Sequence, residues 1–270
     1  MDMIAIPPAN VTYMSVVAVV CILGPIIAAI IAAVRFKSGP MPILIGALIY
    51  VISQLLIRTP LLNLLYGVPG VGDFMASHGV FNDFILSLTT AIVEELARWA
   101  AFFLVLKKRV NDYSAITYGI GHGGAEVIMV AGLAYVNHYL TAQAINLSFT
   151  SPFEADVMAD LAAASVSLSG LFPRDMLLTV VIEAAAVCMH VMYTFIIARG
   201  VRYGTTKITL PLAMGVHFLY VFLSSLVGRF PDGILWQTIF AAVVASGCVY
   251  YLLEARRRAV MSDYEKRRNG

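Results

Sequence analysis

Eight ionisable side chains lie inside stretches of this chain that otherwise contain apolar residues over lengths able to cross a bilayer. Such a group costs about 2.5–3.5 kcal/mol at the centre of a membrane helix on insertion scales, so several are kept only where they pair with one another or do chemistry. Buried carboxylates and imidazoles can transfer protons, activate water or bind metal ions. The eight residues are Glu94, Glu95, Arg98, His122, Glu126, Glu183, His190 and His217.

The first three of these residues form a compact local group. Glu94 and Glu95 precede Arg98 by four and three residues, so on a helix one guanidinium can hold either carboxylate. The carboxylate that Arg98 does not neutralise is then free to act as a general base that takes a proton from water. We therefore interpret this group, together with His122, as catalytic.

Two further carboxylates share helix faces with histidines. In the sequence GHGGAE, His122 and Glu126 are four residues apart, which predicts that Glu126 orients the imidazole of His122. Glu183 and His190 are seven residues apart and also lie on one face. We expect Glu126 and Glu183 to support the histidines from behind. The glycines around His122 let a neighbouring helix approach closely and leave room for a substrate backbone or a water.

The elements that must position these residues are membrane helices. The chain of 270 residues is 60% apolar and 13% charged, with a mean hydropathy of +0.85, so it is predicted to be an all-α integral membrane protein with one domain over 1–270. Two segments between the predicted membrane helices, 66–80 and 137–175, are each long enough for an interfacial helix. The predicted helices are 12–34, 41–65, 81–106, 113–136, 176–198, 208–228 and 234–254.

The basic residues predict how this bundle lies in the membrane. Most of them fall on one side if the N-terminus is outside, so the positive-inside rule places the C-terminus and a basic tail, 255–270, in the cytoplasm. The net charge of +2 is small and forms no continuous patch, which argues against a nucleic-acid partner and for the lipid bilayer. The residues on that side are Arg35, Lys37, Lys107, Lys108, Arg109, Arg199, Arg202, Lys207, Arg256, Arg257, Arg258, Lys266, Arg267 and Arg268.

With this topology, residues from four helices fall at one depth. Glu95, His122, His190 and His217 lie eight to eleven residues from the cytoplasmic ends of their predicted helices. At a rise of about 1.5 Å per residue they lie roughly 12–17 Å deep in a hydrocarbon core about 30 Å thick. We therefore expect the four side chains to meet near the middle of the membrane.

Such a group supports two kinds of hydrolytic chemistry. His122, His190 and His217 could bind zinc and leave one position open for water. Without a metal, a glutamate and a histidine can activate water while another histidine donates to the developing oxyanion. The chain contains no HExxH motif, and its three cysteines have neither disulfide nor CxxC spacing.

Four segments carry a resemblance to a known family. At EELAR, GHGGAE, EAAAVCMH and GVHFLYV, within residues 90–220, the chain resembles the YhfC family of intramembrane peptidases, related to CAAX-prenyl-endopeptidase-like and bacteriocin-immunity membrane proteins. The resemblance implies peptide-bond hydrolysis inside the membrane. It matches Glu94 to the catalytic carboxylate, Glu95 and Arg98 to its supporting pair, and the three histidines to water-activating, ligand or oxyanion positions.

The chain departs from the prenyl-endopeptidase relatives at two points. Those relatives have one more residue between the paired acids and the arginine, and an asparagine where this chain has Val221. Our main hypothesis is an endopeptidase of the bacterial inner membrane that cleaves a membrane-embedded or lipid-linked substrate. The residues are compatible with zinc as a cofactor and also with a metal-free mechanism. The alternatives are a proton- or metal-coupled carrier, since buried Glu and His rows also mark ion pathways, and a catalytically silent immunity or scaffold protein.

Overall fold

The computed structural model describes residues 3–36, 38–150 and 154–269, and all regular structure within them is helical. Lys37 and the side chains of Arg256, Arg258, Lys266, Arg267 and Arg268 lie outside the described residues. The predicted all-α class is confirmed. The helices are α1 (Pro8–Phe36), α2 (Met41–Val51), α3 (Thr59–Tyr66), α4 (Val71–Ser77), α5 (Gly79–Ala100), α6 (Asp112–Val127), α7 (Leu133–Ser148), α8 (Ala155–Ser169), α9 (Pro173–Tyr203), α10 (Thr206–Val227) and α11 (Gly233–Asn269).

Within the described residues, six continuous helices are long and apolar enough to cross a membrane, so the chain is an integral membrane protein. The predicted span 81–106 is also helical, but it carries Glu94, Glu95 and Arg98 and is not among the six. A seventh crossing and the orientation therefore stay predictions. The six are Pro8–Phe36, Met41–Tyr66, Asp112–Ser148, Pro173–Tyr203, Thr206–Val227 and Gly233–Ala255.

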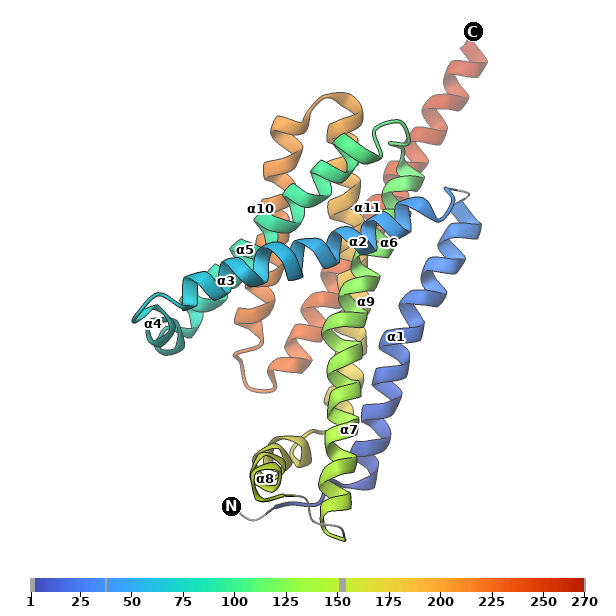
Figure 1. Ribbon diagram of the computed structural model, residues 1–270. Helices are drawn as coiled ribbons and strands as arrows, with labels where there is room; N and C mark the ends of the chain where they lie inside the picture. Colours follow the sequence, from blue (N-terminus) through green and yellow to red (C-terminus); the bar gives the residue numbers. More distant parts are fainter. Residues whose placement is uncertain (1–2, 37, 151–153, 270) are drawn as a thin grey trace.

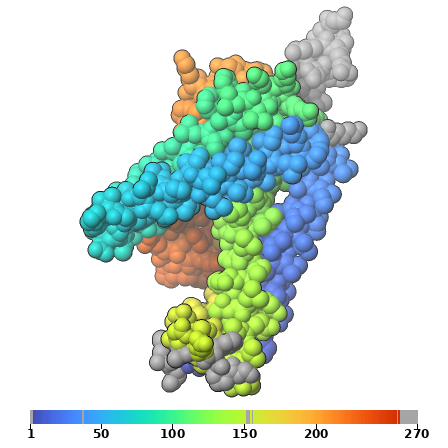
Figure 2. Space-filling view, in the orientation of Figure 1, coloured from blue at the N-terminus to red at the C-terminus, as the bar shows by residue number. Residues whose placement is uncertain are grey.

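Helices α6 and α9 form the centre of the bundle and pack against each other (Figure 1). On one side α1 runs beside both, and on the other α10 and α11 pack on α9. Helix α2 crosses obliquely in front of α6 and packs on it, and α3 continues its line away from α6, in front of α5 (Figure 1). The space-filling view shows this segment covering the upper part of α6 (Figure 2). The site described below lies on α2, α5, α6, α9 and α10 and on the segment Ile52–Arg58 that follows α2.

Glycines allow α6 to approach two neighbouring backbones. A Cβ atom at Gly119 would lie 2.5 Å from the Cα of Val191 on α9, and one at Gly121 would lie 2.8 Å from the Cα of Ile43 on α2. Real Cβ atoms do not tolerate such distances, so both positions require glycine as long as the helices stay this close. The close approach predicted from the glycines around His122 is confirmed.

Three π-helical segments extend these helices: η1 (Ile52–Arg58) joins α2 to α3, η2 (Ala101–Val105) follows α5, and η3 (Ile128–Gly132) joins α6 to α7. A π-turn accommodates an extra residue in a helix and often occurs near functional sites. Through η3 the helix that begins at Asp112 continues to Ser148. The predicted end at 136 was therefore wrong, because no proline or glycine follows before Ser148 to stop the helix.

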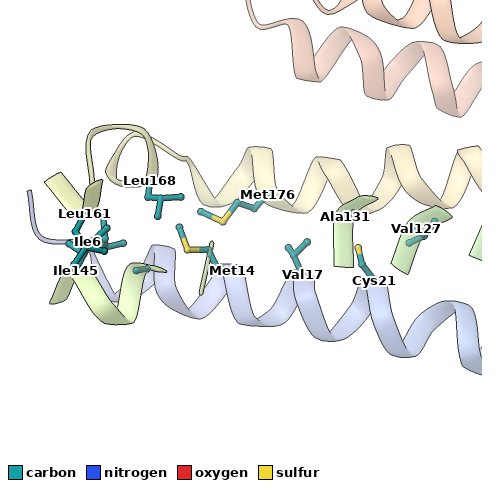
Figure 3. Packing of buried hydrophobic residues seen from close by; sticks show 11 residues of the cluster. Ile6, Met14, Val17, Cys21, Val127, Ala131, Ile145, Leu161, Leu168 and Met176 are labelled. Carbon is teal, nitrogen blue, oxygen red and sulfur yellow. The ribbon is translucent and has the colours of Figure 1, made fainter. Parts of the chain in front are cut away.

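The two segments expected to hold interfacial helices each contain a helix, α4 and α8 respectively. Helix α8 packs near the N-terminus against α7, at the end of the molecule opposite the C-terminus (Figure 1). A cluster of buried apolar side chains joins α1, α7, α8 and α9 there (Figure 3). Asn146 fastens the chain before α1 to this cluster through hydrogen bonds with the backbone N–H and C=O of Ile6, at 2.8 and 3.1 Å.

Candidate active site and metal centre

Arg98 lies at the centre of a buried polar group. Its side chain is completely buried, and its Nη1 donates a hydrogen bond to Oε1 of Glu95 at 2.6 Å. Its Nη2 lies 3.8 Å from Oε2 of Glu94 and 3.0 Å from Nδ1 of His190. The predicted sharing of one arginine by two carboxylates is thus present, with the closer pair at Glu95. A buried arginine is stable only where acids of this kind lie beside it, so the three side chains depend on one another.

Glu94 uses both of its carboxylate oxygens. Oε2 lies 3.0 Å from Nε2 of His122 and 3.9 Å from Nδ1 of His190, and Oε1 accepts a hydrogen bond from the amide of Gln54 at 2.5 Å. The residue is only 1% exposed, so no bulk water competes for these contacts. Glu94 therefore joins α5 to α6, to α9 and to the π-helical segment η1.

The three histidines come together from three helices. The rings of His122 and His190 are 5.0 Å apart between centroids, and those of His190 and His217 are 5.6 Å apart. All three are buried. His217 stacks on Tyr193 at 4.4 Å, and its Nδ1 lies 2.8 Å from Oε1 of Glu95. The convergence expected from their common depth is present in the structure.

One subset of these residues has the spacing of metal ligands. One ligand atom from each of Glu94, His122 and His190 lies within 4.8 Å of the other two. Two ligands of tetrahedral zinc with bonds of about 2.0–2.1 Å lie about 3.3 Å apart, and the two Glu94 distances of 3.0 and 3.9 Å fall on either side of that value. Two imidazoles and one carboxylate form a ligand set that occurs in catalytic zinc sites.

The surroundings of His190 also bear on this fit. Its Nε2 pairs with a carboxylate oxygen of Glu126, and such a carboxylate behind a histidine is common at metal sites because it fixes the ring. Its Nδ1, which faces Glu94, accepts a hydrogen bond from Arg98. The residues present fit a zinc ion, whose binding at Nδ1 of His190 would replace the hydrogen bond from Nη2 of Arg98.

His217 is placed differently from the other two histidines. We expected it to complete a three-histidine ligand set, but among the described residues the converging group contains Glu94 instead. His217 comes from α10, which packs on α5, and its nearest acid is Glu95. The expected ligand role of His217 stays a prediction.

The two supporting carboxylates are separated. Glu126 contacts His190 on α9 rather than His122 on its own helix, so the expected orientation of His122 by Glu126 is not what the structure shows. The reason is that α6 and α9 are close enough for a contact between helices to replace the one along α6. Glu183 lines a cavity of about 280 Å³ between α1, α6 and α9.

Sequence reasoning missed Gln54, which contacts Glu94 directly. Arg58, on the same segment, is linked to Glu94 through this glutamine. The available signal was the polar pair in the sequence SQLLIR, four residues apart within an apolar run. A glutamine carries no charge, so it is not among the ionisable residues by which the site was predicted.

Comparison with known proteins agrees with this geometry. The profile of the YhfC intramembrane metalloprotease family matches residues 20–245, which include every residue of the site. Searches of curated proteins and of solved structures gave no match. A match over this length, with its buried acids and histidines brought together, shows that the chain belongs to the YhfC intramembrane metalloprotease family.

Proposed function

We propose that the protein is a zinc-dependent endopeptidase that hydrolyses a peptide bond of a membrane-embedded or lipid-linked substrate. The observation that carries this proposal is the convergence of Glu94, His122 and His190 within 4.8 Å in a buried position, in a member of a metalloprotease family. A carrier would also contain buried acids, but the three-ligand spacing favours a metal centre.

The ion would be held by Oε2 of Glu94, Nε2 of His122 and Nδ1 of His190. When bound there, zinc would lower the pKa of a coordinated water and polarise the scissile carbonyl. Glu126 contacts the far side of His190 and so keeps that ring facing Glu94. Rings of Tyr50 and Tyr118 flank His122 at 5.3 and 6.0 Å and limit its movement.

Glu95 is the carboxylate that we assign to proton transfer. Its Oε1 is held by Arg98 and His217, while its Oε2 is buried without a hydrogen-bond partner. That oxygen can accept a proton from the attacking water and return it to the leaving amine. This division differs from the one implied by the resemblance, in which Glu94 is the base, because both oxygens of Glu94 already have partners.

The test uses purified full-length protein in lipid bilayers and a library of membrane-anchored peptides. We expect cleavage that a chelator removes and added zinc restores. Glu95→Gln, which removes the proposed base, should lower the rate about 10²–10⁴-fold. His122→Ala and Glu94→Gln, which alter metal ligands, should lower it together with zinc binding. His138→Ala is the control, because this half-buried histidine lies on α7 and its ring contact is with Tyr135. Zinc should bind to the wild-type protein and to the control but not to His122→Ala.

Three results would overturn the proposal. Cleavage that resists the chelator would remove the metal from it. Ion flux through liposomes without cleavage would identify a carrier. Absence of both activities, with substrate peptides still bound, would identify a silent scaffold. We propose that the protein lies in a bacterial inner membrane with its C-terminus on the cytoplasmic side. This orientation is tested separately: a cysteine is placed at either terminus of the protein, and intact cells are treated with a thiol label that does not cross the membrane.

A further inference from the structure

A line of hydrogen bonds leads from the lipid-facing side of the bundle to Glu94. Nη1 of Arg58 donates to Oε1 of Gln54 at 3.2 Å, and Nε2 of Gln54 donates to Oε1 of Glu94 at 2.5 Å. The guanidinium of Arg58 is held against α5 by hydrogen bonds that it donates to the carbonyl of Leu86 at 3.1 Å and to the hydroxyl of Thr89 at 3.4 Å. Two separate segments, η1 and α5, thus hold one carboxylate.

The direction of the Gln54 amide follows from the chemistry of its neighbours. An arginine has only donors, so the atom of Gln54 that faces Arg58 must be the amide oxygen. The NH₂ group then faces Glu94 and donates to its Oε1. Arg58 therefore decides which end of Gln54 meets the acid, and without it the amide could turn over.

The position of Gln54 also explains why an amide lies between Arg58 and Glu94. If Arg58 contacted Glu94 directly, its guanidinium would form an ion pair with the carboxylate and neutralise its charge. The interposed amide fixes one oxygen but leaves the negative charge for partners on the other oxygen. Those partners are His122 at 3.0 Å, Arg98 at 3.8 Å and His190 at 3.9 Å.

We propose that Gln54, oriented by Arg58, is a positioning residue that holds Glu94 with Oε2 aimed at the nitrogens of His122 and His190. The inference rests on the proposed metal centre and adds the device that prepares its one carboxylate ligand. The segment that carries Gln54 is π-helical, and its neighbours Leu55, Leu56 and Ile57 are exposed. The polar pair Gln54 and Arg58 thus turns inward from an otherwise lipid-facing stretch.

The test measures zinc affinity by competition with a chelator, together with thermal unfolding, on the full-length protein. Gln54→Met keeps the length and removes the polar atoms, and it should weaken zinc binding about 10–100-fold, the usual effect of losing a partner behind a metal ligand. Arg58→Gln should weaken binding less. Gln143→Leu is the matched control, because this exposed glutamine on α7 bonds Tyr139, far along the chain from the site, and zinc affinity should be unchanged.

The double variant Gln54→Met/Arg58→Gln separates a relay from two independent contributions. If Arg58 acts through Gln54, the double variant should bind zinc no more weakly than Gln54→Met alone. Additive losses would overturn the relay, and zinc affinity in Gln54→Met within twofold of wild type would overturn the positioning role. If Gln54→Met does not fold, Gln54→Leu is measured by the same criterion. Failure of the wild-type protein to bind zinc would instead refute the proposed metal centre.

Discussion

The buried polar group around Arg98 and the apolar cluster around Met14 are both shielded from solvent, but different forces hold them. In the polar group each charge is stable only because its partners are present, so losing one partner leaves an uncompensated charge. In the apolar cluster stability depends on filled volume, and no single partner is required. The first region therefore limits which residues can stand there, whereas the second limits mainly their size.

Replacing the central arginine should have the largest effect. Arg98→Met leaves the carboxylates of Glu94 and Glu95 buried without their cation, so we expect a loss of about 3–5 kcal/mol in unfolding free energy, measured in detergent. Adding Glu95→Gln should recover part of this loss, since it removes one of the unpaired charges. A single variant as stable as wild type would contradict our description of the polar group.

Truncation in the apolar cluster should rank second. Met14 is completely buried, and Met14→Ala should cost about 2–4 kcal/mol through lost transfer energy and a residual cavity. In contrast to Arg98→Met, zinc affinity of the folded fraction should stay at the wild-type value. A change in zinc affinity would show that the two regions are coupled, against the separation drawn here.

Overpacking between α6 and α2 should rank third. Gly121→Ala places a methyl group against the backbone of Ile43 and should cost about 1–3 kcal/mol, with lowered peptidase activity because the neighbouring His122 shifts. Gly215→Ala is the control, because a Cβ at Gly215 meets nothing within 4 Å. Thermal unfolding and cleavage rate measured on both variants would test this difference.

An exposed ion pair should have the smallest effect. Arg174 donates to Asp232 at 2.7 Å, with side chains 57% and 38% exposed. Arg174→Ala should change the unfolding free energy by less than about 1 kcal/mol, because water and salt screen the pair. The contrast with Arg98→Met, measured by the same unfolding assay, isolates the contribution of burial.

The sequence predicted the parts of this structure that depend on helix periodicity. The pairing of Arg98 with both acids and the common depth of the three histidines follow from rise and rotation along single helices. The predicted spans differ from the observed helices by a few residues, except where α7 and α11 continue well beyond their predicted ends.

Contacts between helices could not be obtained in this way. Three contacts depend on how neighbouring helices are rotated about their axes: Glu126 with His190, His217 with Glu95, and Gln54 with Glu94. This rotation cannot be read from the residue spacing within one helix. The π-helical segment that carries Gln54 adds a further shift, because a wider turn changes the direction of every side chain after it.

The helix from Asp112 to Ser148 has a consequence for what can reach the protein from outside. Its 37 residues span about 55 Å, and even at a tilt of about 40° it exceeds a hydrocarbon layer of about 30 Å by roughly 12 Å. If Asp112 marks one face of the membrane, the C-terminal part of α7 lies among headgroups and water on the opposite face. One continuous helix then connects His122, in the middle of the bilayer, with an aqueous surface that antibodies or soluble factors can reach.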